Sequence, residues 1–215
     1  MGARCVASRS SLERPLIWPR ATCAPLLVLA ALCSPAAAAP VEVTVTDAAG
    51  QALADAVVWV ESAAARAATR PLSGVEVVQQ NRSFVPEVSV VTVGTPVSFP
   101  NRDSVRHHVF SFSPAKRFEL KLYVGTPATP VVFDRPGVSV LGCNIHDNMA
   151  AWVVIVETPW FAKTDAQGRA RLPEVPAGRH QLRAWHSGMA AGVPALQQAL
   201  TVGADALRVA VQVPQ

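Results

Sequence analysis

The sequence predicts an all-β protein, and three kinds of observation support this fold class. Short segments of alternating polar and apolar residues recur along the chain, for example at 41–46, 118–123 and 207–213. Valine is frequent, and glycine and proline interrupt the pattern at short intervals, as they do in sandwiches and barrels. No long segment carries the 3.6-residue period of an amphipathic helix. We therefore expect β-sandwich architecture throughout the mature chain.

Residues 1–39 have the features of a secretory signal peptide. An apolar stretch at 25–32 is followed by small residues at 36–39, which offer a cleavage site near Ala38 or Ala39. The basic residues that precede the apolar stretch are Arg4, Arg9, Arg14 and Arg20. The apolar stretch is too short to cross a bilayer. We expect an exported, periplasmic protein with no stable membrane span in its mature part.

The leader also carries most of the net positive charge. The full chain has 19 Lys and Arg against 15 Asp and Glu, and the leader takes four arginines and one glutamate (Glu13). This leaves 15 basic and 14 acidic side chains, or a net charge of about +1, in the mature protein. A nucleic-acid partner, which requires a basic surface, is therefore not favoured.

The cysteines point to a functional thiol. Three of the four lie in the leader (Cys5, Cys23 and Cys33), so the mature chain keeps only Cys143. Exported proteins meet an oxidising compartment in which cysteines are normally paired. A buried, inert cysteine is the plain alternative. The neighbours of Cys143 favour a role as a metal ligand.

The segment 142–149 contains the pattern C-x-x-H-x-x-M, formed by Cys143, His146 and Met149. It lies between two apolar segments that read as strands, so the ends of this loop are held rigidly. Thiolate and imidazole with a weak thioether is the donor set of blue-copper sites, which also require a second histidine. The pair His107 and His108 can supply it. Because successive strand residues point to opposite faces, only one of the two can reach the metal.

These residues resemble the cupredoxins, the type 1 copper proteins of the plastocyanin and amicyanin kind. The resemblance covers 75–157 and includes Phe84-x-Pro86, the run 93–101 and the segment 107–110. The loop spacing is most similar to amicyanin, and the whole chain is similar to exported bacterial proteins labelled methylamine utilization. The resemblance implies a Greek-key β-sandwich holding one copper ion. The implied ligands are His107, Cys143, His146 and Met149.

Two positions depart from the family pattern. His108 stands where these proteins usually have Asn, and Gly142 stands where an aromatic residue is common before the cysteine. His108 is expected either to tie the two ligand loops together or to serve as an exposed electron exit. The candidates for hydrogen bonds around the ligands are Asn101, His108 and Asp147. We expect His180 and His186, near the C-terminus, to have surface or packing roles rather than to bind metal.

The flanking segments 40–65 and 160–215 resemble carboxypeptidase-regulatory-like β-sandwiches in their turn motifs. Neither segment has enough strands to bury a face alone. We therefore predict one small sandwich built from both, with the cupredoxin domain inserted between them. Strands at 41–46 and 207–213 should then share one sheet or core. The residues at 63–73, rich in Ala and Arg, are expected to form a linker.

The favoured function is a periplasmic single-electron carrier. Its partner would be a cytochrome or a periplasmic dehydrogenase, and an amine dehydrogenase is implied by the resemblance alone. A copper chaperone or sensor that binds Cu(I), and a binding or scaffold module with a non-redox site, remain alternatives. Zinc suits the Cys and His donors but does not normally use Met. We expect no enzymatic activity, since the sequence has no nucleophile elbow, second metal cluster or paired carboxylates.

Overall fold

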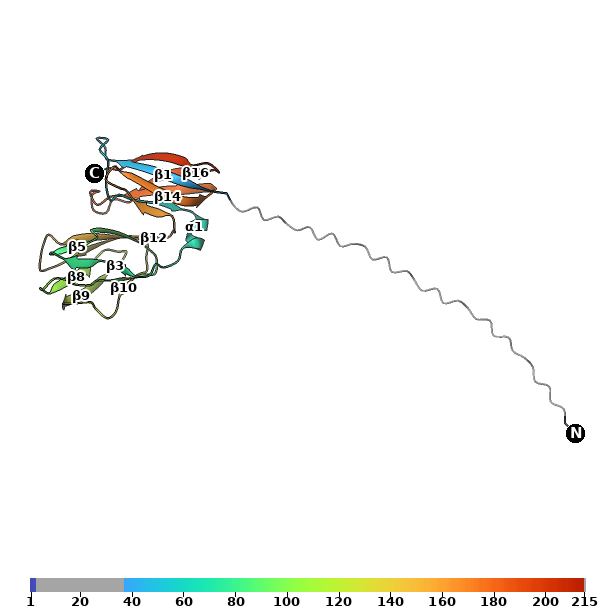
Figure 1. The fold of residues 1–215 in the computed structure, drawn as a ribbon, viewed down its shortest axis with the longest axis horizontal. Coiled ribbons are helices and arrows are strands. Elements are labelled where there is room, and N and C mark those ends of the chain that lie inside the picture. The colour runs from blue at the N-terminus through green and yellow to red at the C-terminus, as the bar shows by residue number, and fades with distance from the viewer. Residues whose placement is uncertain (3–36, 215) are drawn as a thin grey trace. The chain divides into compact units, whose positions relative to one another are not determined.

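The computed structural model describes residues 1–2 and 37–214, and this part of the chain is almost entirely β-structure (Figure 1). The predicted all-β class is confirmed. Residues 36–215 form one compact unit. Most of the predicted signal peptide lies outside the described residues. Strand β1 begins at Ala38, so cleavage after Ala38 or Ala39 would remove its first residues. No helix in the described residues is long and apolar enough to cross a membrane.

Segments from both ends of the described chain build one pair of sheets. The first sheet has the order β14-β1-β17, and the second has the order β13-β2-β15-β16. β1 pairs in parallel with β17, with Val41 opposite Leu207 and Val45 opposite Val211. The division into two domains with one inserted in the other stays a prediction. The strands are β1 (Ala38–Thr46), β2 (Val57–Glu61), β13 (Phe161–Lys163), β14 (Arg169–Pro176), β15 (Gly178–Trp185), β16 (Leu196–Val202) and β17 (Leu207–Gln212).

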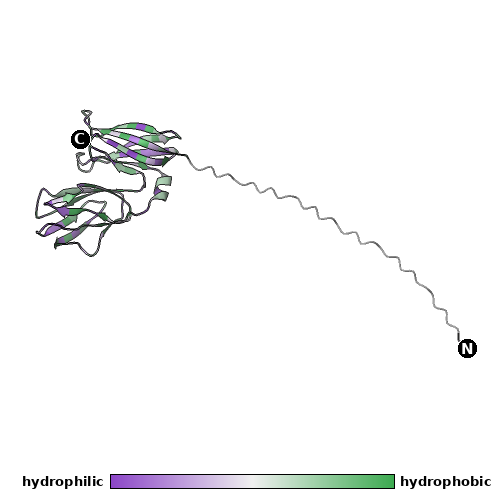
Figure 2. Cartoon of the chain, in the orientation of Figure 1, coloured by the Kyte–Doolittle hydropathy of each residue, from purple (hydrophilic) through white to green (hydrophobic). Residues whose placement is uncertain are grey.

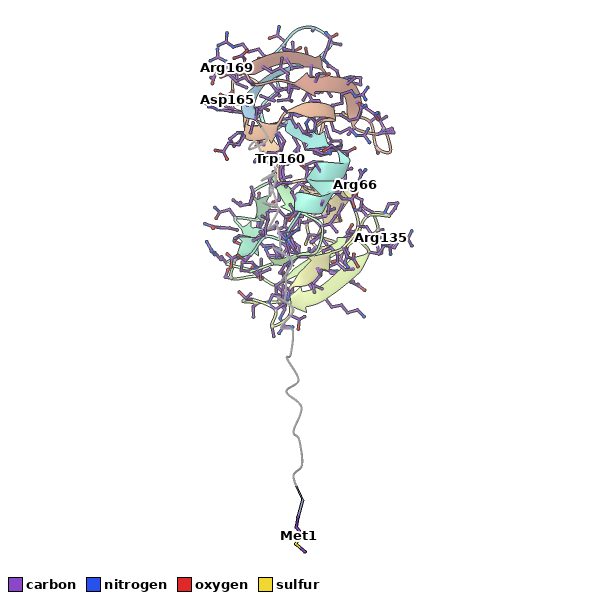
Figure 3. The ribbon with its side chains drawn as sticks, turned by 90° about the vertical axis from the view of Figure 1, so that its right-hand side faces the viewer. Met1, Arg66, Arg135, Trp160, Asp165 and Arg169 are labelled. Atoms are coloured by element: carbon purple, nitrogen blue, oxygen red, sulfur yellow. The ribbon has the colours of Figure 1, made fainter. Side chains whose placement is uncertain are left out.

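Alternating polarity explains how these strands pack. In β1 the valines Val41, Val43 and Val45 are buried, while the residues between them are exposed or half-buried. Figure 2 shows this as alternating green and purple along the strands. The turn before β14 is fixed by the Asp165 carboxylate, which accepts hydrogen bonds from the backbone N–H groups of Gln167 and Arg169 (Figure 3). Side-chain capping of this kind is typical of Asp in turns.

The middle of the chain forms a second group of sheets around its own core. A five-stranded sheet has the order β6-β12-β11-β8-β9, a three-stranded sheet has the order β10-β7-β3, and β4 pairs with β5. Phe99, Phe133 and Leu141 are almost fully buried in this core. The strands are β3 (Val75–Glu76), β4 (Val78–Gln80), β5 (Ser83–Val85), β6 (Val88–Thr92), β7 (Thr95–Ser98), β8 (His107–Ser111), β9 (Phe118–Tyr123), β10 (Val131–Phe133), β11 (Gly137–Gly142) and β12 (Ala150–Val156).

The segment expected to be a linker contains a short helix, α1 (Ala63–Ala68), which was not predicted from the sequence. Ser62 caps the helix, because its Oγ accepts a hydrogen bond from the N–H of Ala65 at 3.0 Å. Alanine has the highest helix propensity, and a run of Ala behind a Ser cap is enough for one or two turns. Ala65 is buried, which anchors the helix to the sheets.

Tyr123, the last residue of β9, ties the core to the end of the sandwich where the histidines lie. Its hydroxyl donates to the carbonyl of Phe99 at 2.7 Å and accepts a hydrogen bond from the fully buried Gln79 side chain. Its backbone lies opposite His107 in the β8–β9 pair. Burial raises the pKa of Tyr123 to about 12 and outweighs the hydrogen bond from Gln79, which acts to lower it.

The Tyr123 pKa is directly measurable because the chain contains a single tyrosine. In the folded, metal-free protein we expect tyrosinate absorption to appear near pH 12 rather than at the ordinary value of about 10. The raised pKa means that the stability due to this buried phenol is complete below pH of about 10 and is lost as pH rises toward the folded value. An ultraviolet titration, with circular dichroism to show that the fold persists, measures this. Ionisation near pH of about 10 in protein that is still folded would contradict the prediction.

Candidate metal centre

His107 begins β8 and points its ring into the interior. It is fully buried, and its Nδ1 lies 3.8 Å from the sulfur of Cys143. The next residue, His108, faces the opposite side of the sheet, as strand alternation requires. Its Nε2 lies 3.0 Å from a carboxylate oxygen of Glu119 on β9, but not in hydrogen-bonding geometry. The structure therefore brings His107, and not His108, to Cys143.

Cys143 directly follows β11 and is buried, with 5% of its surface exposed. It is a free thiol. Gly142, before it, lies opposite Phe110 on β8, and the Phe110 ring covers the glycine closely enough that an added Cβ would meet Cζ at 2.8 Å. The aromatic ring that the family pattern leads one to expect at position 142 is thus supplied from the adjacent strand. A side chain at position 142 would require the Phe110 ring to move, because the ring occupies that space.

His146 lies in the loop between β11 and β12 and completes a cluster of three donors. The donor atoms of His107, Cys143 and His146 all lie within 4.8 Å of one another. The two imidazole rings are 5.2 Å apart between centroids. The Nδ1 atom of His146 is buried and has no hydrogen-bond partner among the described residues. A buried polar atom without a partner is costly, and a bound metal would satisfy it.

Met149 closes the same loop. Its backbone N–H donates to the carbonyl of His146 at 3.0 Å, which forms a tight turn. Its side chain is buried, with 2% exposed, and belongs to the same core cluster as Cys143. The role of Met149 as a fourth, axial donor stays a prediction.

Asp103 is the residue at this site that the sequence reasoning missed. Its Oδ2 lies 2.8 Å from Nε2 of His107. A carboxylate can only accept a hydrogen bond, so Nε2 carries a proton, and in the neutral form of the ring the lone pair lies on Nδ1, toward Cys143. A carboxylate behind a metal-ligating histidine is the usual second-sphere arrangement. The one available signal was the spacing of four residues between Asp103 and His107, which is weak in a loop.

The hairpin tip between β4 and β5 holds Asp103 in place. The backbone N–H of Asn81 donates to Oδ1 at 2.7 Å, and that of Arg82 donates to Oδ2 at 2.9 Å. Asn81 and Arg82 both have left-handed backbone conformations, with φ of 54° and 55°. Such conformations are uncommon for residues with side chains. Here they aim two adjacent N–H groups at one carboxylate.

These contacts also set the charge of Asp103. Burial acts to raise its pKa, but the hydrogen bonds from the backbone of Arg82, from His107 and from the backbone of Asn81 together outweigh this effect. The pKa of Asp103 is therefore held below its ordinary value, and the carboxyl group is ionised near neutral pH. An ionised carboxylate also makes the Nε2 hydrogen bond of His107 stronger.

The predicted hydrogen-bonding residues have different places. Asn101 orders the loop before His107: its Nδ2 donates to the carbonyls of Val105 and Tyr123, and its Oδ1 accepts from the N–H of Asp103. It therefore supports Asp103 rather than a ligand. Asp147 is exposed. His180 is buried, with Nε2 2.8 Å from the carbonyl of Pro176, which agrees with a packing role but not with a surface one.

The cluster fits a metal ion. Two donors that bind one ion at about 2.0 and 2.3 Å are separated by about 3.5–3.7 Å at tetrahedral or trigonal angles. The observed separation between Nδ1 of His107 and the Cys143 sulfur is 3.8 Å. The separation of these two donors is thus close to that required, and the third residue, His146, offers a buried imidazole nitrogen without a partner among the described residues.

No family model matches the chain, and no curated protein matches it in sequence. Among solved structures, the chain is similar to a Cu-containing nitrite reductase (NirK) from Thermus scotoductus SA-01, with 26% identity and a TM-score of 0.37, over 41% of this chain and only 23% of that one. It is similar to a purple cupredoxin from Nitrosopumilus maritimus, with 21% identity and a TM-score of 0.34, over 38% of this chain and 99% of that one. It is also similar to an amicyanin variant in its reduced Cu(I) form at pH 4, with 20% identity and a TM-score of 0.35, over 46% and 98%. These scores are low, so the interpretation of the site depends on its own geometry.

Proposed function

We propose that this protein binds one copper ion through His107, Cys143 and His146, with Met149 as a weak axial donor, and carries single electrons. The observation that carries the proposal is the convergence of three donor atoms within 4.8 Å, drawn from β8 and from the loop after β11. When bound, copper supplies reversible one-electron chemistry at such a site. We further propose that the protein acts in the periplasm, with a cytochrome or a dehydrogenase as its partner.

The donor set favours copper over zinc. Structural zinc sites take four Cys or His ligands in a closed tetrahedron, whereas this cluster offers three strong donors and a thioether nearby. Thiolate and thioether together are soft ligands and select copper. Among the described residues the chain has no other cysteine to complete a zinc site.

The protein's own contribution is to hold the ligands still. His107 is fixed by its carboxylate partner, and Cys143 by the end of a central strand. Both are nearly or fully buried, so neither can change rotamer without disturbing close packing. A site that holds its ligands rigidly in both oxidation states has little to rearrange on electron transfer. This supports a carrier rather than an enzyme.

The exposed part of the site is the edge near His146. His107 is fully buried, whereas His146 is only partly buried and its neighbour Ile145 is 48% exposed. A partner protein would approach from this side, since the least protein would then separate it from the donor atoms. Exposed Val105, in the loop before His107, adds apolar surface. Apolar contacts around a partly exposed ligand suit a transient redox complex.

Addition of Cu(II) to the purified, metal-free protein tests the proposal. We expect one equivalent to bind and to produce the intense visible absorption and EPR signal of a copper–thiolate site. Cys143→Ser should abolish the visible band, because the thiolate is its source, while His186→Gln, outside the cluster, should leave it unchanged. Binding of Cu(I) without any coloured Cu(II) form would favour a copper chaperone instead. If the protein binds neither Cu(II) nor Cu(I), the remaining alternative is a binding or scaffold module with a non-redox site.

The Asp103 contact gives a second prediction. In Asp103→Asn, the amide NH₂ replaces one acceptor oxygen: facing Asn81 it loses one hydrogen bond, and facing Arg82 and His107 it loses two. We expect copper affinity to fall by about 10–100-fold while the visible band keeps its character. Competition against a chelator measures the affinity. Asp134→Asn, which removes an exposed carboxylate paired with Lys116, is the matched control. Equal affinities for the two variants would show that Asp103 does not position His107.

A further inference from the structure

A cleft of about 920 Å³ lies against the outer face of the five-stranded sheet, away from the metal cluster. One wall comes from Val138 and Val140 on β11 and Trp152 on β12. The inner face of the same strands is different: Leu141 and Val153 point into the core around the donors. Because side chains alternate along β11, one face of this strand lines the cleft and the other face packs around the donor residues.

The opposite wall is aromatic. It is formed by Trp59 on β2, Trp185 at the end of β15 and Met189 in the loop that follows. Trp152 and Trp185 both line the cleft and contact each other, with ring centroids 6.5 Å apart and planes inclined by 50°. Three of the four tryptophans in the described residues thus gather at one site, and the fourth is Trp160. Rigid indole rings provide flat apolar surface at little entropic cost.

A short polar chain borders this apolar surface. Nε1 of Trp59 donates to one oxygen of Glu61 at 2.8 Å, and the other oxygen accepts from Nε of Arg183 at 3.1 Å. Nη1 of Arg183 donates to Gln197 at 2.9 Å. The Nη2 group of Arg183 has no hydrogen-bond partner among the described residues. The charges of Glu61 and Arg183 compensate each other, so the cleft offers spare N–H donors without a net charge.

From these features we propose that the cleft binds a planar aromatic small molecule that carries an uncharged oxygen acceptor, such as an aromatic ketone. The ring system would lie against the indoles, and the oxygen would accept from Nη2 of Arg183. The volume is at the upper end of the range for small-molecule sites, which is about 300–1,000 Å³. An anionic ligand is disfavoured because the Glu61 carboxylate already neutralises Arg183.

The proposal is independent of copper, so the test uses metal-free protein. The probe is 2-acetonaphthone, with naphthalene as the analogue that lacks the oxygen, and binding is followed by ligand-observed NMR and by quenching of tryptophan fluorescence. We expect saturable binding of 2-acetonaphthone, tighter than that of naphthalene. Arg183→Lys, which keeps the charge but removes the Nη2 donors, should reduce the affinity for the ketone to that for naphthalene.

A substitution that fills the cleft with a larger side chain distinguishes binding in the cleft from general adsorption to the protein surface. Val140, 46% exposed on β11, lines the cleft, whereas Val132, 44% exposed on β10, does not. Val140→Trp should weaken binding of 2-acetonaphthone by at least about tenfold, and Val132→Trp should leave it unchanged. Ala191→Trp, in the loop at the cleft, is a second filling variant in case the first folds poorly, as judged by thermal melting. Absence of saturable binding to the wild type, or equal binding by both valine variants, would overturn the proposal.

Discussion

The hydrogen bond between Asp103 and Nε2 of His107 is the contact on which the geometry of the donor cluster depends. It fixes the tautomer of the ring, and with it the atom that faces Cys143. Without the carboxylate, a buried imidazole could carry its proton on either nitrogen, and the form protonated on Nδ1 would turn an N–H toward the sulfur. The cost of holding an ionised carboxylate so close to the core is offset by two backbone N–H groups of the β4–β5 hairpin. The uncommon backbone conformations of Asn81 and Arg82 thereby help to fix, through Asp103, the orientation of His107 on β8.

The five-stranded sheet separates two environments by the alternation of its side chains. On the inner face, β11 leads to Cys143 through residues that pack in the core, such as Leu141. On the outer face the same strand presents Val138 and Val140 to the cleft. Phe110 belongs to this outer face and covers Gly142, so the residue before the cysteine is shielded without a side chain of its own. The close packing of Leu141 and Cys143 in the inner core leaves the position of the thiol little freedom.

Much of the fold was predictable because it depends on local patterns. The alternating segments at 41–46 and 207–213 each predict a strand, and the structure pairs them in parallel. Strand alternation also limited the choice between His107 and His108 to one residue, although only the family resemblance selected His107. The predictions failed where tertiary contacts decide. Asp103 was missed because its partners lie about 20 residues away in a hairpin, and no local pattern reports such a contact. The helix at Ala63–Ala68 was missed because a short alanine run depends on its Ser62 cap and on the burial of Ala65.

The arrangement of the donors has a consequence for how an electron would reach them. His107 and Cys143 lie at the ends of strands that are neighbours in one sheet, so their separation is set by the sheet itself. His146 belongs instead to a loop and is the partly exposed member of the cluster. The rigid pair defines the site, and the loop histidine connects it to the surface. Because Cys143 is buried, solvent has little access to its sulfur, and oxidation of the thiol is correspondingly disfavoured. Burial of the sulfur thus accounts for a free cysteine at this position without a second cysteine nearby in the described residues.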